Sequence, residues 1–160
     1  MLYRRWRLEL HMPKANPQWQ HFQNGAEVLC AFKGEHGYIS PSWYAGAPNV
    51  PTWNSVVLHV YGKPRLIEDP VEKKAMMTRL VDAMEAGFDE PWRMELPEKY
   101  EMGMLSGIAA VEIEITRMQG KAKLSQNRKP EDAKGAIAGL RATGRAEDAR
   151  LADLMAEQLA

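Results

Sequence analysis

The stretch Val111-Glu112-Ile113-Glu114-Ile115-Thr116 shows the clearest secondary-structure pattern in the chain. Apolar and polar side chains alternate with a period of two, which is the period of a β-strand. We therefore expect the valine and the two isoleucines on a buried face of a sheet, and the glutamates and the threonine on a solvated face. Two glutamates on a solvated strand face are more simply explained as surface residues than as a catalytic pair.

Weaker strand patterns lie on the N-terminal side of this stretch. Short apolar or aromatic runs predict further strands, and a proline-containing segment predicts one or two helical turns. The predicted strands are Arg7–His11, Ala26–Phe32, Gly37–Ile39 and Ser55–Tyr61, and the turns occupy Ala15–Phe22.

A helix start stands at Asp69-Pro70-Val71-Glu72. Asp69 can cap free backbone N–H groups, Pro70 suits the first helical position, and Glu72 can complete a capping box. Apolar residues then recur on one helical face, where the methionines are interpreted as core residues rather than as ligand contacts. This face consists of Met77, Leu80, Val81 and Met84, and Gly87 ends the pattern.

From Glu131 onward, alanine, glycine and charged residues dominate. The pattern predicts two helices separated near Thr143-Gly144, and the second has an apolar stripe that must pack on the domain or on another subunit. The stripe consists of Leu151, Leu154, Met155 and Leu159. We therefore predict an α+β fold in a single domain over residues 1–160, in which 131–160 form a helical C-terminal segment.

The composition limits the classes of partner. The 160 residues include 21 Lys and Arg and 21 Asp and Glu, so the net charge of zero gives no general attraction to nucleic acid or anionic membranes. A small basic cluster, Arg4, Arg5 and Arg7, is interpreted as a charged terminus.

Cys30 is the only cysteine, which excludes an intramolecular disulfide. We expect its thiol to be buried and the protein to be cytoplasmic.

Several familiar site types are absent from the sequence. It contains no Gly-x-Gly-x-x-Gly or P-loop pattern, and the four histidines lack metal-ligand spacing. We therefore predict no metal site and no catalytic residue.

Aromatic and polar residues gather in two neighbouring segments, Tyr38–Tyr44 and Val50–Asn54. Aromatic faces beside hydroxyl and amide groups suit a planar heteroaromatic ligand, which needs stacking and edge hydrogen bonds. The simpler interpretation is that Trp43 and Trp53 anchor loops on the core.

The segment Lys123-Leu124-Ser125-Gln126-Asn127-Arg128 places two cations around a hydroxyl and two amides. Such groups can neutralise a phosphate and bind it or a ring by hydrogen bonds. A solvated polar loop is the alternative. A similar choice applies to Lys14 and Asn16, which suit an anion site at a strand-to-helix junction, while Asn16-Pro17 also suits a capping turn.

These segments occur in an order that resembles the PaiB-like FMN-binding negative transcriptional regulator family of bacteria. The resemblance is carried by Ala15–Trp19, Tyr38–Tyr44, Val50–Asn54 and Lys123–Arg128, and it runs from about His11 to Leu140. It implies an FMN-binding split β-barrel with flanking helices, a homodimer, and flavin mononucleotide near the subunit interface. Lys14, Asn16, Lys123 and Arg128 are then expected at the phosphate or ribityl chain, and Trp53, Asn54, Ser125 and Gln126 at the ring.

Members of this family usually carry several dozen residues before the segment that matches His11–Trp19. Only ten residues precede His11 here, so we expect a barrel that lacks its first strands and exposes sheet edges. Such a barrel is incomplete, is filled by a partner chain, or is a shortened gene product.

The resemblance leaves several functions open. A regulator of gene expression is the first, with DNA binding implied by the resemblance alone. The alternatives are a flavin-dependent oxidoreductase, a haem-binding relative with His11, His36 or His59 as ligands, and a dimer that has lost its cofactor. Because no residue has the pattern of a catalytic acid, base or nucleophile, the sequence favours a protein that is not an enzyme.

Overall fold

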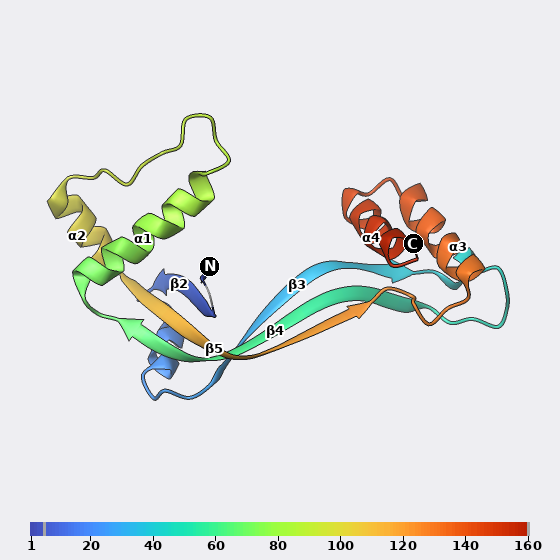
Figure 1. Cartoon of the computed structure of the whole chain (residues 1–160), viewed down its shortest axis with the longest axis horizontal. Coiled ribbons are helices and arrows are strands. Elements are labelled where there is room, and N and C mark those ends of the chain that lie inside the picture. The colour runs from blue at the N-terminus through green and yellow to red at the C-terminus, as the bar shows by residue number, and fades with distance from the viewer. Residues whose placement is uncertain (5, 160) are drawn as a thin grey trace. The chain divides into compact units, whose positions relative to one another are not determined.

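The computed structural model describes residues 1–4 and 6–159. Five strands form one antiparallel sheet in the order β1-β2-β5-β4-β3 (Figure 1). The strands are β1 Leu2–Arg4, β2 Arg7–Pro13, β3 Val28–Ile39, β4 Thr52–Ile67 and β5 Ile108–Lys123. The helices are the 3-10 helices η1 Pro17–Phe22 and η2 Pro41–Trp43, and α1 Pro70–Glu85, α2 Glu98–Ser106, α3 Pro130–Ala142 and α4 Ala146–Glu157.

The chain divides into two compact units. Unit 1 comprises Met1–Leu29 and Val60–Arg117, and unit 2 comprises Cys30–His59 and Met118–Ala160. The strands β3, β4 and β5 each contribute residues to both. The single domain over residues 1–160 stays a prediction, and each unit is described by itself below.

Unit 1 is built on the pairing of β2 with the first half of β5. Leu8 lies opposite Ile113 and Leu10 opposite Val111 in this antiparallel ladder. Val111, Ile113 and Ile115 are buried, whereas Glu114 and Thr116 are exposed. The alternation in the sequence therefore predicted both the strand and its buried face. Arg5 of the basic cluster lies outside the described residues, and Arg7 forms an ion pair with Glu112 at 3.2 Å.

Helix α1 begins where the sequence predicts. The Asp69 carboxylate accepts hydrogen bonds from the backbone N–H groups of Val71 (3.2 Å) and Glu72 (3.4 Å). No capping-box bond from Glu72 is formed; its carboxylate binds the Arg65 guanidinium at 2.5 and 3.2 Å, which lowers the pKa of Glu72. A bidentate pair with a guanidinium is stronger than a bond to a backbone N–H.

Several other predictions from the local sequence differ from the structure, because tertiary packing alters the burial and the length of the elements. Of the face predicted for α1, Leu80 is buried, Met77 and Val81 are half-buried, and Met84, at its end, is exposed; Lys73 and Met76 are the other buried residues of this helix. Helix α2 was not predicted, because its sequence lacks a clear apolar period. The two strands predicted between residues 26 and 39 form one continuous strand, β3, and Cys30 in it is half-buried rather than buried.

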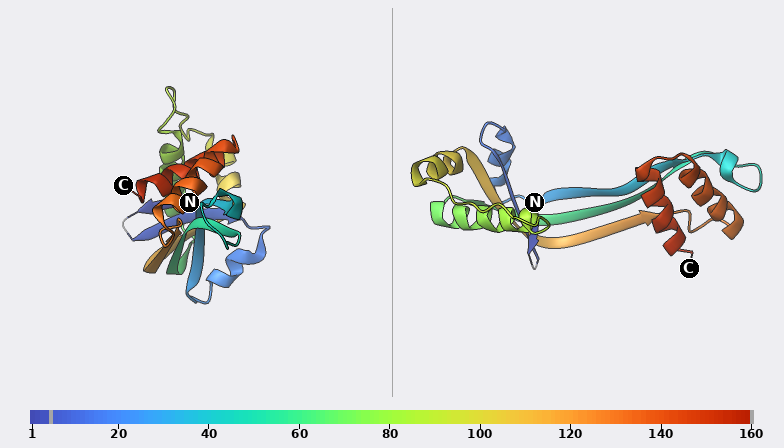
Figure 2. Two further views of the ribbon diagram at one scale, coloured as in Figure 1. Left: turned by 90° about the vertical axis from the view of Figure 1, so that its right-hand side faces the viewer. Right: turned by 90° about the horizontal axis from the view of Figure 1, so that it is seen from above.

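Unit 2 has its own core beneath α3 and α4, which lie side by side (Figure 2). These two helices and the break between them confirm the C-terminal prediction. Three residues of the predicted stripe pack in or against this core, while Leu159 lies beyond the end of α4 and is exposed. The core consists of Ile39, Tyr44, Leu124, Ala136, Ile137, Leu140, Leu151, Ala152 and Met155.

Trp43 packs directly on helix α3, where two glycines leave room for it. A Cβ atom added at Gly139 would overlap the Trp43 ring, and one added at Gly135 would overlap the Trp43 carbonyl oxygen. The interpretation of Trp43 as a loop anchor is therefore confirmed. The two glycines allow Trp43 to lie close to the α3 backbone, although glycine lowers the helix propensity of α3.

This contact yields a stability prediction with a matched control. Replacing Gly by Ala inside an exposed helix stabilises by about 1 kcal/mol through helix propensity. At Gly139 the overlap with Trp43 outweighs that gain, since overpacking costs about 1–3 kcal/mol. In urea unfolding, Gly139→Ala should lower the midpoint, whereas Gly103→Ala in α2, which meets nothing within 4 Å, should raise it. A rise in both variants would show that Trp43 does not rest on α3 as described.

Candidate functional site

The side chain of Asn54 in β4 holds the loop that follows β5 in unit 2. Its Nδ2 group donates hydrogen bonds to Ser125 Oγ (2.9 Å) and to Met155 Sδ (3.3 Å), so both N–H groups are used. Asn54 is fully buried and Ser125 nearly so. Ser125 has a φ of 64°, a left-handed conformation that costs free energy for a residue other than glycine. The hydrogen bond from Asn54 therefore supports a strained turn.

The other end of the Asn54 amide has no partner among the described residues. Its Oδ1 atom is buried without a hydrogen bond, and so is the hydroxyl of Tyr44. Turning the amide around would leave its nitrogen unpaired instead. A buried polar atom without a partner costs roughly 1–3 kcal/mol, so native proteins keep few of them. A hydrogen-bonding ligand would remove this cost.

Two cations lie at the same loop. Lys123 donates a hydrogen bond to Thr52 Oγ1, and Arg128 donates one to Asn49 Oδ1 at 2.8 Å. The Arg128 guanidinium also lies over the Tyr44 ring, 4.7 Å from its centroid. Within residues 1–4 and 6–159, neither cation forms an ion pair with a carboxylate. Their positive charges are available to an anion such as a phosphate.

The remaining predicted residues of unit 2 behave in two ways. Gln126 closes its own loop, because its Oε1 accepts from the backbone N–H of Leu124 and its Nε2 donates to the carbonyl of Ala122. Trp53 is 59% exposed and meets Tyr38 edge to face at a centroid distance of 6.0 Å. It does not anchor a loop as Trp43 does, and it presents an aromatic surface to solvent.

Lys14 and Asn16 belong to unit 1, whereas the other six predicted residues belong to unit 2. The Asn16 Oδ1 atom caps η1 by accepting a hydrogen bond from the backbone N–H of Gln18 at 3.0 Å, so the capping interpretation is confirmed. Lys14 lines a cavity of about 290 Å³ with Trp19 and Lys73. Burial and the nearby charge of Lys14 both lower the pKa of Lys73. The two lysines outnumber Glu68, the carboxylate that also lines this cavity, so the cavity is a second candidate anion site, although Lys73 Nζ already donates to the carbonyl groups of Leu105 and Ile108.

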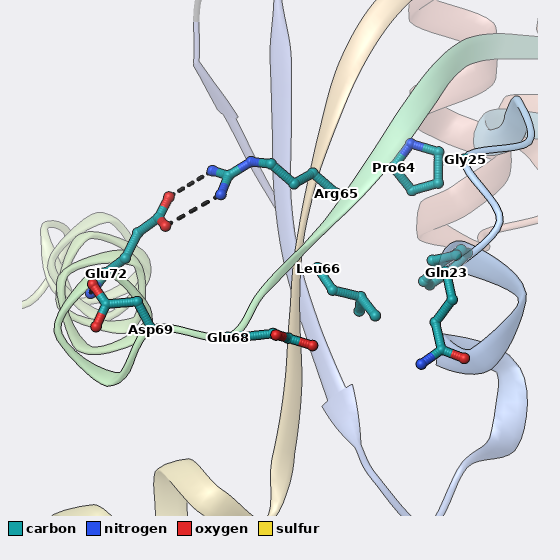
Figure 3. Close-up of a pocket in the computed structure, with 9 residues that line it drawn as sticks. Gln23, Gly25, Pro64, Arg65, Leu66, Glu68, Asp69 and Glu72 are labelled. Atoms are coloured by element: carbon teal, nitrogen blue, oxygen red, sulfur yellow. Dashed lines mark hydrogen bonds and ion pairs between the residues drawn. The ribbon is translucent and has the colours of Figure 1, made fainter.

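Another cavity in unit 1 is a poor place for an anion. It has a volume of about 610 Å³ and is lined by Arg65, Glu68, Asp69 and Glu72, among others (Figure 3). Its one guanidinium is already bound by Glu72 and by Glu112. The three carboxylates outnumber this cation, so the local charge disfavours a phosphate.

Residues 1–4 and 6–159 contain neither a metal cluster nor a membrane-spanning helix. Nowhere in that part of the chain do three or more His, Cys, Asp or Glu side chains gather as a metal site would require. Nor does any helix there combine the length and the apolar character needed to cross a bilayer.

The structure adds three residues that the sequence did not single out as site residues. Tyr44, Asn49 and Thr52 contact the predicted cations. All three lie within or between the two aromatic segments, so their position near the site was readable from the sequence. Their pairing with Lys123 and Arg128 was not, because more than 70 residues separate the partners along the chain.

A family of FMN-binding domains and a bacterial relative match this chain. The sequence profile of the family described as "Putative FMN-binding domain" matches residues 2–117. The matched region contains Lys14, Asn16, Trp53 and Asn54 and ends before the Lys123–Arg128 loop. The protease synthase and sporulation protein PAI 2 of Bacillus subtilis is 36% identical over 151 residues, which cover 93% of this chain and 72% of that protein.

Two solved structures share the fold. The FAD and haem binding protein from Mycobacterium smegmatis matches with a TM-score of 0.55 and 15% identity, over 81% of this chain and 60% of that one. The flavocytochrome Anf3 from Azotobacter vinelandii matches with a TM-score of 0.53 and 17% identity, over 73% and 50%. The chain thus spans half to three fifths of these proteins. The predicted α+β split-barrel fold is confirmed.

Proposed function

Because the chain belongs to the FMN-binding domain family and to its PaiB-like members, we propose that it is a cytoplasmic FMN-binding protein that acts as a negative regulator of transcription. Flavin binding is supported by the family match and by the residues of unit 2. The regulatory role is supported by the resemblance to the PaiB-like family.

The buried Asn54 amide is the observation that carries the flavin proposal. It is held rigidly by Ser125 and Met155, yet its Oδ1 atom has no partner. FMN carries donors on its ribityl hydroxyls and on its ring N–H, and acceptors on its ring and phosphate. The polar groups of unit 2 therefore match those of FMN. The oxygen atoms of Asn54 and Tyr44 can accept hydrogen bonds, and Lys123 and Arg128 can bind the phosphate.

Each residue then has a chemical role in binding. The two cations neutralise the phosphate, Trp53 offers an aromatic face to the ring, and Asn54 and Ser125 shape the floor of the site. Gln126 keeps the loop closed, and its Nε2 group carries a second hydrogen that could be donated to the ring. When bound, FMN would supply a redox-active ring, and the chain positions it. Lys14 and Asn16 of unit 1 are the alternative phosphate or ribityl contacts.

The phosphate contact can be tested with a matched pair of lysines. Lys123→Met should weaken FMN binding by about tenfold or more, because a charge-assisted bond to the phosphate is lost. Riboflavin, which lacks the phosphate, should bind both proteins equally. Lys121→Met is the control, since this exposed lysine precedes Lys123 by two residues on β5. Quenching of flavin fluorescence gives the affinities.

Two results would contradict this assignment. If Lys123→Met and Lys121→Met bind FMN as the wild type does, the phosphate does not lie at the unit 2 loop. If Lys14→Met alone loses FMN and keeps riboflavin, the phosphate lies in the Lys14 and Lys73 cavity of unit 1 instead.

The regulatory role predicts a change in transcript levels. Deleting the gene in its host should raise the abundance of a defined set of transcripts, measured by RNA sequencing. The wild-type gene should restore repression, and the Lys123→Met gene should restore it less well. An unchanged transcriptome, combined with rapid reduction of the bound flavin by NADH or NADPH, would favour the oxidoreductase alternative.

We also propose a homodimer, because unit 2 leaves large apolar side chains exposed on its strands. Phe32, Tyr38, Trp53, Leu58 and Met118 are each at least 36% exposed, and such surfaces usually mark interfaces.

Sedimentation velocity should therefore give twice the 18.1 kDa chain mass. Leu58→Lys should shift the protein toward monomer, because a charge would be buried in the interface. Val71→Lys, at an exposed site in unit 1, should not. A monomeric wild type at micromolar concentration would rule the dimer out.

A further inference from the structure

A third cavity of unit 1 has an almost entirely apolar wall. It lies between α1, α2 and the segment that joins them, and has a volume of about 350 Å³. This volume falls within the range of small-molecule sites. The apolar wall includes Met77, Val81, Trp92, Met94, Leu96 and Leu105.

One buried charged group lines this cavity. Glu101 is 5% exposed, and its Oε2 atom accepts a hydrogen bond from Lys74 Nζ at 2.7 Å. Its Oε1 atom is buried and has no hydrogen-bond partner among the described residues. A buried carboxylate oxygen without a donor is costly, more so than a neutral acceptor. The cavity therefore combines apolar walls with one unsatisfied acceptor.

His11 and Tyr100 are the other polar side chains of the wall, and neither donates a hydrogen bond to Glu101 Oε1. His11 also lines the cavity, and burial lowers the pKa of its imidazole, which favours the neutral ring. Lys74 is already engaged with the other oxygen of Glu101. The cavity offers no free cation from these residues, so it does not suit a phosphate.

We propose that this cavity binds a small aromatic molecule that carries one N–H donor, with the donor directed to Glu101 Oε1 and the ring against Trp92 and the methionines. Aromatic rings pack favourably against both kinds of side chain. The site is independent of the flavin site proposed in unit 2.

Indole and 1-methylindole test the proposal, because they have the same ring system and only indole carries the N–H. The full chain is labelled with 5-fluorotryptophan, and the Trp92 signal is assigned in the 19F spectrum with Trp92→Phe. Indole should shift the Trp92 signal and bind about tenfold more tightly than 1-methylindole, the gain expected for a hydrogen bond to a charged group. No shift of Trp92, or equal affinity for the two probes, would overturn the proposal.

Two variants distinguish the effect of the Glu101 Oε1 acceptor on indole binding from the effect of the Lys74–Glu101 ion pair. Glu101→Met removes both, and should bind indole and 1-methylindole equally. Lys74→Met removes only the ion pair and should keep the preference for indole. The other tryptophan signals report whether each variant is folded; should Glu101→Met fail to fold, the wild type and Lys74→Met still decide. Loss of the preference in Lys74→Met would overturn the role of Oε1.

Saturating FMN supplies the final comparison. Indole should still shift the Trp92 signal when FMN is present, and it should do so even in a protein that binds no FMN. Displacement of indole by FMN would assign the cavity to the flavin and overturn the proposal.

Discussion

Strand β5 is paired on both sides, and both units depend on the hydrogen-bond ladders along it. It lies between β2 and β4 in the sheet, and its residues belong to unit 1 up to Arg117 and to unit 2 from Met118. In unit 1 its buried face, Val111, Ile113 and Ile115, forms part of the core. In unit 2 it ends at Lys123, directly before the loop held by Asn54. The same strand therefore supports a hydrophobic core and delivers a polar loop.

The polar loop after β5 contains two local features that cost free energy of folding. Ser125 takes a left-handed backbone conformation, and Asn54 keeps one end of its amide unpaired in a buried position. Costs of this kind persist where the surrounding structure compensates for them, and they concentrate at binding sites. The core of α3 and α4 supplies that compensation here, since Met155 of α4 contacts the Asn54 amide. A ligand that reached Asn54 Oδ1 with a donor would remove one of these costs.

Predictions from the sequence succeeded where the signal was local. The alternation at Val111–Thr116, the Asp69 cap and the break near Thr143 each depend on a few neighbouring residues, and each is confirmed. Expectations failed where a distant partner decides the outcome. Glu72 prefers Arg65 to its own helix end, and β3 continues through exposed polar residues because strand pairing supports it, without an apolar pattern.

The candidate site was predicted in the same uneven way. The side-chain chemistry of Trp53, Asn54 and the Lys123–Arg128 loop predicted them as site residues, and the structure places them in one unit. It also places Lys14 and Asn16 in the other unit, which spacing along the chain could not foresee. Asn49 and Thr52 escaped prediction, because short polar residues in loops are common and their partners are remote.

The central claim is that flavin binds at the Asn54 loop. The most direct measurement is the 1H–15N NMR signal of the Asn54 side-chain amide, assigned with Asn54→Leu, during addition of FMN. The account predicts that this signal shifts and saturates at one FMN per chain, together with the Ser125 backbone signal. An unchanged Asn54 signal, with shifts confined to Lys14, Trp19 and their neighbours, would contradict it.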